Sequence, residues 1–89
     1  MNLSEIVPRE IKGKKYSYEI KLVSKMPPKV SALYNGSPLL SIGYDEKSLL
    51  CNLDDDDLYE FVSSSVFLLE SDIKQGFLDK RIDKYKNVN

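Results

Sequence analysis

The stretch from Asp54 to Gly76 constrains the fold most, because it carries a helix start, an apolar face and a helix stop. Asp54 is a good N-cap, with Leu53 and Leu58 spaced as a hydrophobic staple. Gly76 can adopt the left-handed conformation that ends a helix. At about 100° per residue, one broad face between these signals is apolar. Its members are Leu58, Phe61, Val62, Val66, Leu68, Leu69 and Ile73. The sequence therefore predicts one long amphipathic helix here.

Two weaker helical patterns lie at the ends of the chain. Behind Ser4 as N-cap, apolar residues recur at helical spacing until Pro8 interrupts them, which predicts a short N-terminal helix. These residues are Leu3, Ile6, Val7 and Ile11. A second C-terminal helix is predicted from Phe77 to Lys86, and it must dock on the rest of the protein because it is short and charged. Its apolar stripe consists of Leu78, Ile82 and Tyr85.

Alternation of apolar and polar residues from Tyr16 to Lys25 predicts a strand with one buried face. The inward set is Tyr16, Tyr18, Ile20 and Leu22. Val23 breaks the alternation. The pair Asn35-Gly36 marks a later hairpin turn, since both residues tolerate positive φ.

The remaining strands complete an antiparallel meander. Prolines 27 and 28 lack amide donors and are expected to interrupt the ladder before the next strand. The further predicted strands are Val30–Tyr34, Leu39–Tyr44 with Pro38 at its first position, and Ser48–Leu53.

The predicted fold class is α+β, in a single domain of residues 1–89. It comprises a short N-terminal helix, a meander of three or four strands and two C-terminal helices packed on one face. Because an open meander leaves its edge strands unpaired, a monomer and a homodimer are both compatible with this fold.

The residue types that most enzymes need are missing. The chain has no His and a single Cys, Cys51, which excludes a Cys–His nucleophile and a zinc site within one chain. The four glycines stand apart and do not form a phosphate-binding loop. We therefore expect a non-enzymatic protein with no metal and no cofactor.

The expected location is the cytoplasm. A lone Cys cannot form an internal disulfide, which is typical of a reducing compartment. The N-terminal residues up to Lys15 contain no apolar stretch of signal-peptide type. The longest apolar run, Val66 to Leu69, is far shorter than the ~20 residues of a membrane span, so no membrane segment is expected.

Charge is unevenly distributed in a chain whose net charge is −1. Residues 54–72 carry seven acidic and no basic side chains, whereas residues 73–89 carry five basic and two acidic ones. Two interpretations remain open. The acidic first helix and the basic tail attract each other modestly within the chain, or the acidic stretch meets a basic surface on a protein partner and steers their encounter.

Four consecutive aspartates, Asp54 to Asp57, open the acidic segment. Carboxylates in a first helical turn are favoured by the helix dipole by ~0.3–1 kcal/mol each. The run lacks the alternating ligands, the central Gly and the closing Glu of a calcium loop. We interpret it as a helix start that can also contact a partner, and we expect no metal site.

The basic N-terminal third does not predict a nucleic-acid surface. Recognition by stacking needs aromatic and cationic side chains on one exposed face. Strand alternation places Tyr16 and Tyr18 on one face and Lys21 on the other. We therefore favour a protein partner over direct nucleic-acid binding.

Phe67 breaks the pattern of the long helix, since it lies about 180° from the side that holds Leu58 and Leu69. Either the C-terminal helix folds back over it, which we favour, or it is an exposed anchor for a partner. A large aromatic among serines is typical of an interface hot spot. Tyr59, beside the acidic residues, would complete such a patch.

The residues Met1-Asn2 and Arg9-Glu10-Ile11-Lys12, followed by Tyr16, are similar to the start of an acidic inhibitor of Cas9. With its size and element order, the chain thus resembles the small phage-encoded anti-CRISPR proteins. The resemblance implies a non-catalytic inhibitor that presents carboxylates to a site normally occupied by nucleic acid. In that acidic member the carboxylates lie in loops and the C-terminal part, whereas here they open a helix and the C-terminus is basic.

The function predicted is that of a phage-type inhibitor, acting in the host bacterial cytoplasm. It would bind a basic, nucleic-acid-handling protein, such as a CRISPR effector nuclease, and block its nucleic-acid site. The residues expected to face the partner are Asp54, Asp55, Asp56, Asp57, Tyr59, Glu60 and Phe67. One alternative is an accessory subunit, or an antitoxin- or immunity-like module, recognised through apolar surface. Another is a small RNA- or DNA-binding protein that uses the lysines of residues 12–29.

Overall fold

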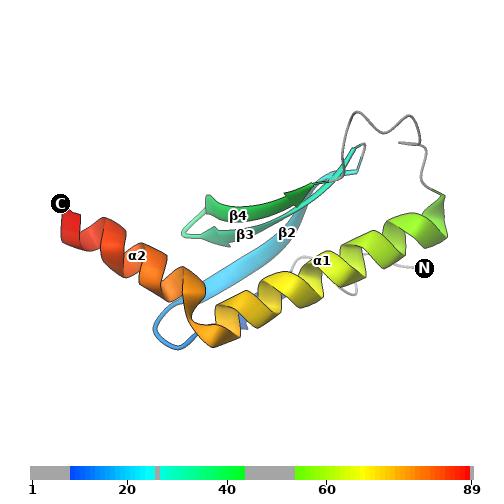
Figure 1. Cartoon of the computed structure of the whole chain (residues 1–89). Helices are drawn as coiled ribbons and strands as arrows, with labels where there is room; N and C mark the ends of the chain where they lie inside the picture. Colours follow the sequence, from blue (N-terminus) through cyan, green and yellow to red (C-terminus); the bar gives the residue numbers. More distant parts are fainter. Residues whose placement is uncertain (1–8, 26, 44–53, 89) are drawn as a thin grey trace.

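Four strands and two helices form the part of the chain that the computed structural model describes, residues 9–25, 27–43 and 54–88 (Figure 1). The strands pair in chain order in one antiparallel sheet. They are β1 (Arg9–Lys12), β2 (Ser17–Lys25), β3 (Pro28–Tyr34) and β4 (Ser37–Gly43). The helices are α1 (Asp55–Gln75) and α2 (Phe77–Val88). The α+β class, the meander and the two C-terminal helices are confirmed.

β2 places its apolar side chains on the face that the helices cover. Tyr18 and Ile20 are 2% and 0% exposed, and Tyr16 and Leu22 pack against the same core. Val23 sits at a shift in register between Leu22 and Ser24, which turns it outward. The predicted alternation and its one exception are both confirmed.

The predicted N-terminal helix is wrong for residues 9–12, and the positions before them lie outside the described residues. Arg9–Lys12 form strand β1, in which Ile11 pairs with Tyr18 and is buried. The chain reverses at Gly13, whose amide donates to the carbonyl of Tyr16 at 2.8 Å. A Cβ at Gly13 would lie 2.9 Å from Cε2 of Tyr18, so only glycine fits this turn. Pairing along β2 thus overrides the helical spacing of Ile11.

The central hairpins match the prediction except at strand ends. β3 begins at Pro28 rather than Val30, because a proline is tolerated as the first residue of a strand. β4 begins at Ser37, one residue before Pro38. Asn35 and Gly36 form the predicted turn, with φ of 50° and 82°. The predicted strand Ser48–Leu53 lies outside the described residues.

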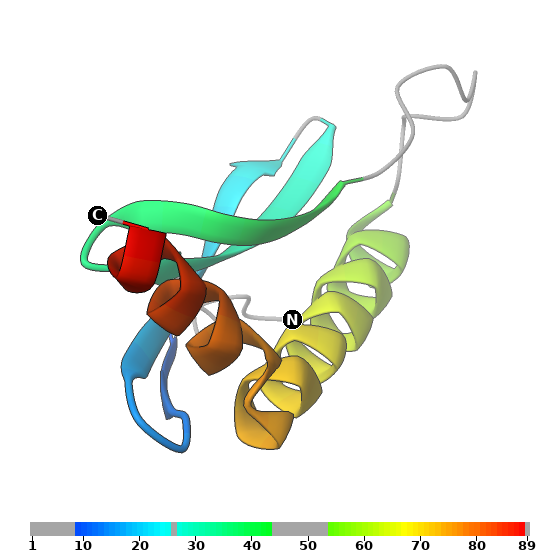
Figure 2. The ribbon, with the colours of Figure 1, turned by 60° about the vertical axis from the view of Figure 1, so that its left-hand side comes forward.

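α1 runs across one face of the sheet and supplies four of the eleven buried apolar core residues found among the described residues (Figures 1 and 2). Val62, Val66, Leu69 and Ile73 are 0–3% exposed and pack with Ile20, Val30 and Ala32 of the sheet. The assignment of Leu68 to this buried face is wrong, since it is 54% exposed.

Gly76 separates the helices, as predicted, in a left-handed conformation with φ of 85°. α2 then leads away from α1 and docks through Leu78 and Ile82, which are 2% and 5% exposed. Tyr85, predicted on the same stripe, is instead 72% exposed. Neither helix, within the described ranges, is long and apolar enough to cross a membrane.

Candidate functional site

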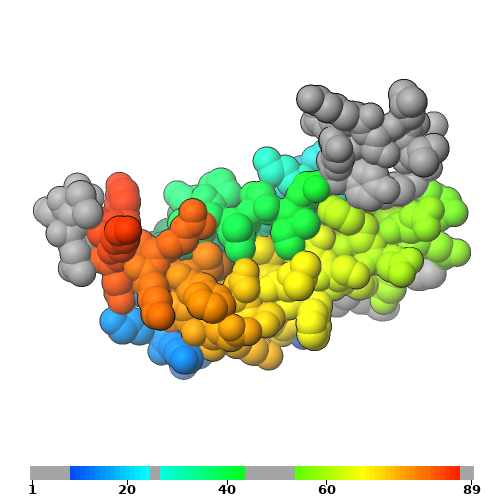
Figure 3. Space-filling model, viewed as in Figure 1, coloured from blue at the N-terminus to red at the C-terminus, as the bar shows by residue number. Residues whose placement is uncertain are grey.

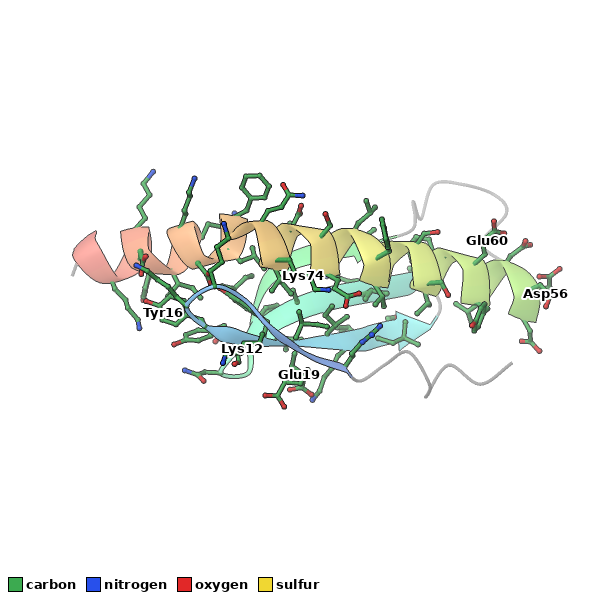
Figure 4. All side chains as sticks on the ribbon, turned by 90° about the horizontal axis from the view of Figure 1, so that it is seen from below. Lys12, Tyr16, Glu19, Asp56, Glu60 and Lys74 are labelled. Carbon is green, nitrogen blue, oxygen red and sulfur yellow. The ribbon has the colours of Figure 1, made fainter. Side chains whose placement is uncertain are left out.

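Five carboxylates gather at the start of α1, and we call them the acidic end: Asp54, Asp55, Asp56, Asp57 and Glu60. All five side chains are exposed. Asp54 is the N-cap, as predicted, since its Oδ1 accepts the Asp57 amide at 2.7 Å. Figure 4 labels Asp56 and Glu60 near the start of α1, well away from Lys12, Tyr16 and Lys74. One aspartate therefore fixes the helix start and the others are left on the surface.

No cation neutralises the acidic end within the described ranges. The ion pairs found there engage Glu19, Glu70 and Asp83 instead. The negative charge of Asp54, followed by burial and by Glu60 and Asp56, raises the pKa of Asp57. Mutual repulsion is therefore not relieved within the described fold, and a cationic surface on another molecule would relieve it.

Asp56, Glu60 and Phe67 share the side of α1 that faces away from the sheet. At about 100° per residue, Asp56 and Phe67 lie about 40° and 20° from Glu60. Phe67 is 70% exposed, so our favoured interpretation, that the C-terminal helix covers it, is wrong. The reason is the turn at Gly76, which directs α2 toward the strands rather than back along α1.

Leu68, which the sequence pattern had assigned to the buried apolar face of α1, is exposed beside these residues. We call Asp56, Glu60, Ser64, Phe67 and Leu68 the outer face of α1; all are exposed. Figure 3 shows the outward side of α1 running along the molecule to the base of α2. A shallow hollow of about 360 Å³ adjoins Phe67. It is lined by Phe67, Glu70, Ser71, Lys74 and Gln75. The face thus combines carboxylates at one end with an apolar anchor further along.

Four of the predicted partner-facing residues do not belong to the outer face of α1: Asp54, Asp55, Asp57 and Tyr59. Tyr59 is half-buried and lies about 100° from Glu60 around the helix. Asp55 lies about 140° from Glu60, so it belongs to the acidic end but projects to another side. The structure therefore unites Asp56, Glu60 and Phe67 and leaves Tyr59 apart from them.

The acidic helix start does not pair with the basic tail in this fold. α1 contains 21 residues, a length of about 32 Å at 1.5 Å per residue, and α2 begins at its far end (Figure 1). This distance is about three Debye lengths at 0.1 M salt, so attraction between the two ends is largely screened. The interpretation of an internal charge pair therefore fails for the carboxylates at the start of α1. It holds for Glu70 near the end of α1, whose Oε1 lies 3.6 Å from Nζ of Lys74 in the basic segment 73–89.

The aspartates of α2 neutralise the basic turn between β1 and β2 instead. Asp79, only 4% exposed, accepts the Tyr18 hydroxyl at 2.5 Å and the Lys15 amide at 3.0 Å. Asp83 accepts Lys15 Nζ and the Tyr16 hydroxyl, both at 2.7 Å. The spacing of these aspartates, one helical turn apart, was a signal in the sequence that could have indicated a shared contact.

These contacts shift the pKa values in opposite directions. Burial raises the pKa of Asp79, but hydrogen bonds from Tyr18 and from backbone amides outweigh it and leave the pKa below its ordinary value. Hydrogen bonds from Lys15 and Tyr16 lower the pKa of Asp83. Burial, with the hydrogen bond to Asp79, raises the pKa of Tyr18. Among the described residues no buried side-chain nitrogen or oxygen lacks a hydrogen-bond partner, so the polar groups buried in this contact are paired within the fold.

Within the described ranges, no group of three or more potential ligands could hold a metal ion. No family model, curated protein or solved structure matches this chain. The surfaces described above therefore carry the functional argument.

Proposed function

We propose that this chain is a non-enzymatic protein-binding domain that docks the outer face of α1 on a basic protein surface. One observation carries the proposal: uncompensated carboxylates and the exposed Phe67 lie on the same side of one helix. Carboxylates steer a basic partner and fix its orientation, and a desolvated aromatic supplies most of the affinity. In this proposal Asp56 and Glu60 orient the partner, and Phe67 provides most of the binding energy.

The partner we propose is a protein that handles nucleic acid, such as a CRISPR effector nuclease. Surfaces that bind DNA or RNA are basic because they neutralise phosphates. A row of exposed carboxylates is complementary to such a surface and competes with phosphate for it. The resemblance to the anti-CRISPR proteins supports the same reading, in which the chain acts as a phage-encoded inhibitor in the bacterial cytoplasm.

The test uses the full chain as bait in a nuclease-treated bacterial lysate at low and high salt. A retained protein is then purified, and displacement of its labelled nucleic acid by the chain is measured. We expect salt-labile binding that D56N/E60Q weakens several-fold. The matched control E10Q/E19Q changes the net charge equally on the sheet and should bind as the wild type. Equal effects of both variants, or no displacement of nucleic acid, would refute the proposal.

The exposure of Phe67 supports a second candidate, an accessory or immunity-like module bound through apolar contacts. This function predicts salt-resistant binding and a loss of about 2 kcal/mol or more in Phe67→Ala. Val23→Ala is the control, because Val23 is 56% exposed on the sheet and outside α1. Strong loss in F67A with unchanged binding in D56N/E60Q would select this candidate over the first.

A further inference from the structure

We propose that the exposed face of α2 and the groove beside it bind single-stranded nucleic acid. Phe77 and Tyr85 are 51% and 72% exposed. Three exposed cations lie on the same side of the helix: Lys80, Arg81 and Lys84. At about 100° per residue, all five side chains fall within an arc of about 140°. We call them the basic face of α2.

The aspartates of the same helix do not neutralise this basic face. Asp79 and Asp83 point to the strands and are held by Tyr18, Tyr16 and Lys15. Among the described residues, no ion pair involves Lys80, Arg81 or Lys84. The inward placement of the acids therefore leaves a locally cationic surface on a chain whose net charge is negative.

A groove of about 590 Å³ continues this surface between α2 and the turn that joins β3 to β4. Its lining includes Tyr34, Pro38, Leu39, Arg81, Tyr85 and Lys86, and none of its lining residues is acidic. Lys86 Nζ lies 4.6 Å from the centre of the Tyr16 ring and 5.9 Å from that of Tyr34. The groove thus holds two cations, Arg81 and Lys86, beside the rings of Tyr34 and Tyr85, a combination typical of surfaces that hold phosphates and stack bases.

Lys14 adds a further exposed cation at the junction of the two helices, where a Cβ at Gly76 would lie 3.3 Å from its Cδ. The acidic end lies at the opposite end of α1, about 32 Å away along the helix. Salt screens charges over such a distance, so the acidic end does not repel phosphates from α2.

The geometry favours nucleic acid over an acidic peptide as the occupant. A peptide would gain most by adding a strand to the neighbouring edge strand β4. There, Arg81 Nη1 already donates to the Leu39 carbonyl at 2.9 Å and takes up part of that edge. Exposed rings such as Tyr85 offer faces on which any base can stack, and the surrounding cations suit the backbone phosphates.

The first experiment measures fluorescence anisotropy of a labelled oligodeoxythymidylate of about 12 nucleotides, within the ~4–16 that single-strand sites cover. The full chain is titrated at about 50 and 200 mM salt. K80Q/K84Q should weaken binding about tenfold at the lower salt. It should also reduce the salt slope by about 1.4, the value for two lost phosphate contacts. K21Q/K29Q, with equal charge loss on the sheet, is the control and should bind as the wild type.

Substitutions of Tyr85 test stacking separately from charge. Tyr85→Ala should weaken binding at least about fivefold, the low end for one stacked base, whereas Tyr85→Phe should retain it. D56N/E60Q should leave the affinity unchanged or slightly raised, so this proposal can fail while the proposed function of α1 stands. No binding at low salt, or equal loss in K80Q/K84Q and K21Q/K29Q, would overturn it. Binding of an oligoglutamate peptide in place of the oligonucleotide would also overturn it, and would assign the surface to an acidic protein.

Discussion

The two helices both carry aspartates, but they use them in opposite ways. At the start of α1 the aspartates are exposed, and the negative charge of Asp54 raises the pKa of Asp57. In α2, Asp79 and Asp83 receive hydrogen bonds from the β1–β2 turn, and their pKa values are lowered. The difference arises from what the backbone brings to each helix. α2 packs beside a turn rich in lysine and tyrosine, whereas no described cation pairs with the start of α1.

This contrast predicts that the aspartates of α2 contribute to stability, whereas those of the acidic end are available for binding. The aspartates of α2 are occupied within the fold, so we expect their removal to destabilise the protein. Those of the acidic end, apart from the cap residue Asp54, oppose one another, so we expect their removal to change binding with little effect on stability. Four predictions, from the largest expected effect to the smallest, test this division.

The largest effect is expected for Asp79→Ala. The change leaves the Tyr18 hydroxyl and the Lys15 amide without an acceptor, and each unsatisfied buried donor costs about 1–3 kcal/mol. We expect the free energy of unfolding in urea to fall by about 3 kcal/mol. Asp79→Asn keeps an acceptor oxygen and should lose less. A wild-type urea midpoint in D79A would show that this contact does not stabilise the fold.

The same contact should set the pH dependence of stability. The folded-state pKa values of Asp79 and Asp83 lie below the ordinary value of 3.8, so their contribution is complete above that pH and is lost as pH falls further. The pKa of Tyr18 is raised above 10.0, so its contribution is present below pH 10 and is lost as pH rises beyond it. Urea midpoints measured across pH should therefore fall at both extremes.

Two variants identify which residues cause the loss of stability at low pH and at high pH. D79N should flatten the fall in acid, because its side chain no longer titrates. Tyr18→Phe should flatten the fall in alkali while retaining the part of the acid limb due to Asp83. Asp57, whose pKa is raised, acts in the opposite sense, since its protonation relieves repulsion. If the urea midpoints of both variants depend on pH as in the wild type, other titratable groups cause the pH dependence.

A smaller effect is expected at the helix cap. Asp54→Ala removes the acceptor of the Asp57 amide and should lower the free energy of unfolding by about 1 kcal/mol. The core amides of Val66 and Leu69 exchange by global unfolding, so they should exchange about fivefold faster, in line with this loss. Asp54→Asn retains a capping oxygen and serves as the control. Unchanged exchange at Val66 and Leu69, with an unchanged urea midpoint, would show that the cap does not contribute to stability.

The smallest effect on stability is expected for D56N/E60Q. These exposed side chains have no cationic contact among the described residues, so the change should stay within about 0.5 kcal/mol. Urea unfolding beside E10Q/E19Q provides the comparison. A loss as large as that of D79A would show that the acidic end serves the fold and would remove the division between the two helices.

Local patterns predicted most of the elements. The cap at Asp54, the stop at Gly76 and the turn at Asn35-Gly36 are properties of a few adjacent residues, and the structure contains all three. The predicted helix near the N-terminus failed over residues 9–12, because the β ladder with β2 depends on a strand that comes later in the chain. Helical spacing of a few apolar residues cannot reveal such pairing.

The candidate surfaces were predicted less completely. The carboxylates of the acidic end were found because charge and helix start are both visible in the sequence. The exposure of Phe67, Leu68 and Tyr85 was not predicted, because it depends on how the helices pack and on the direction that α2 takes after Gly76. The sequence showed aromatics and cations in α2, but only the packing of Leu78 and Ile82 decides which side of that helix faces outward.

The sequence by itself determined where α1 begins and ends, how β2 alternates and where charge accumulates, since these depend on neighbours along the chain. Tertiary structure alone decided that residues 9–12 form an edge strand and that the aspartates of the two helices differ. It also placed the acidic end and the basic face of α2 at opposite ends of the molecule (Figure 1). The physical reason is that burial and hydrogen bonding depend on contacts between residues far apart in the sequence, such as Tyr18 and Asp79.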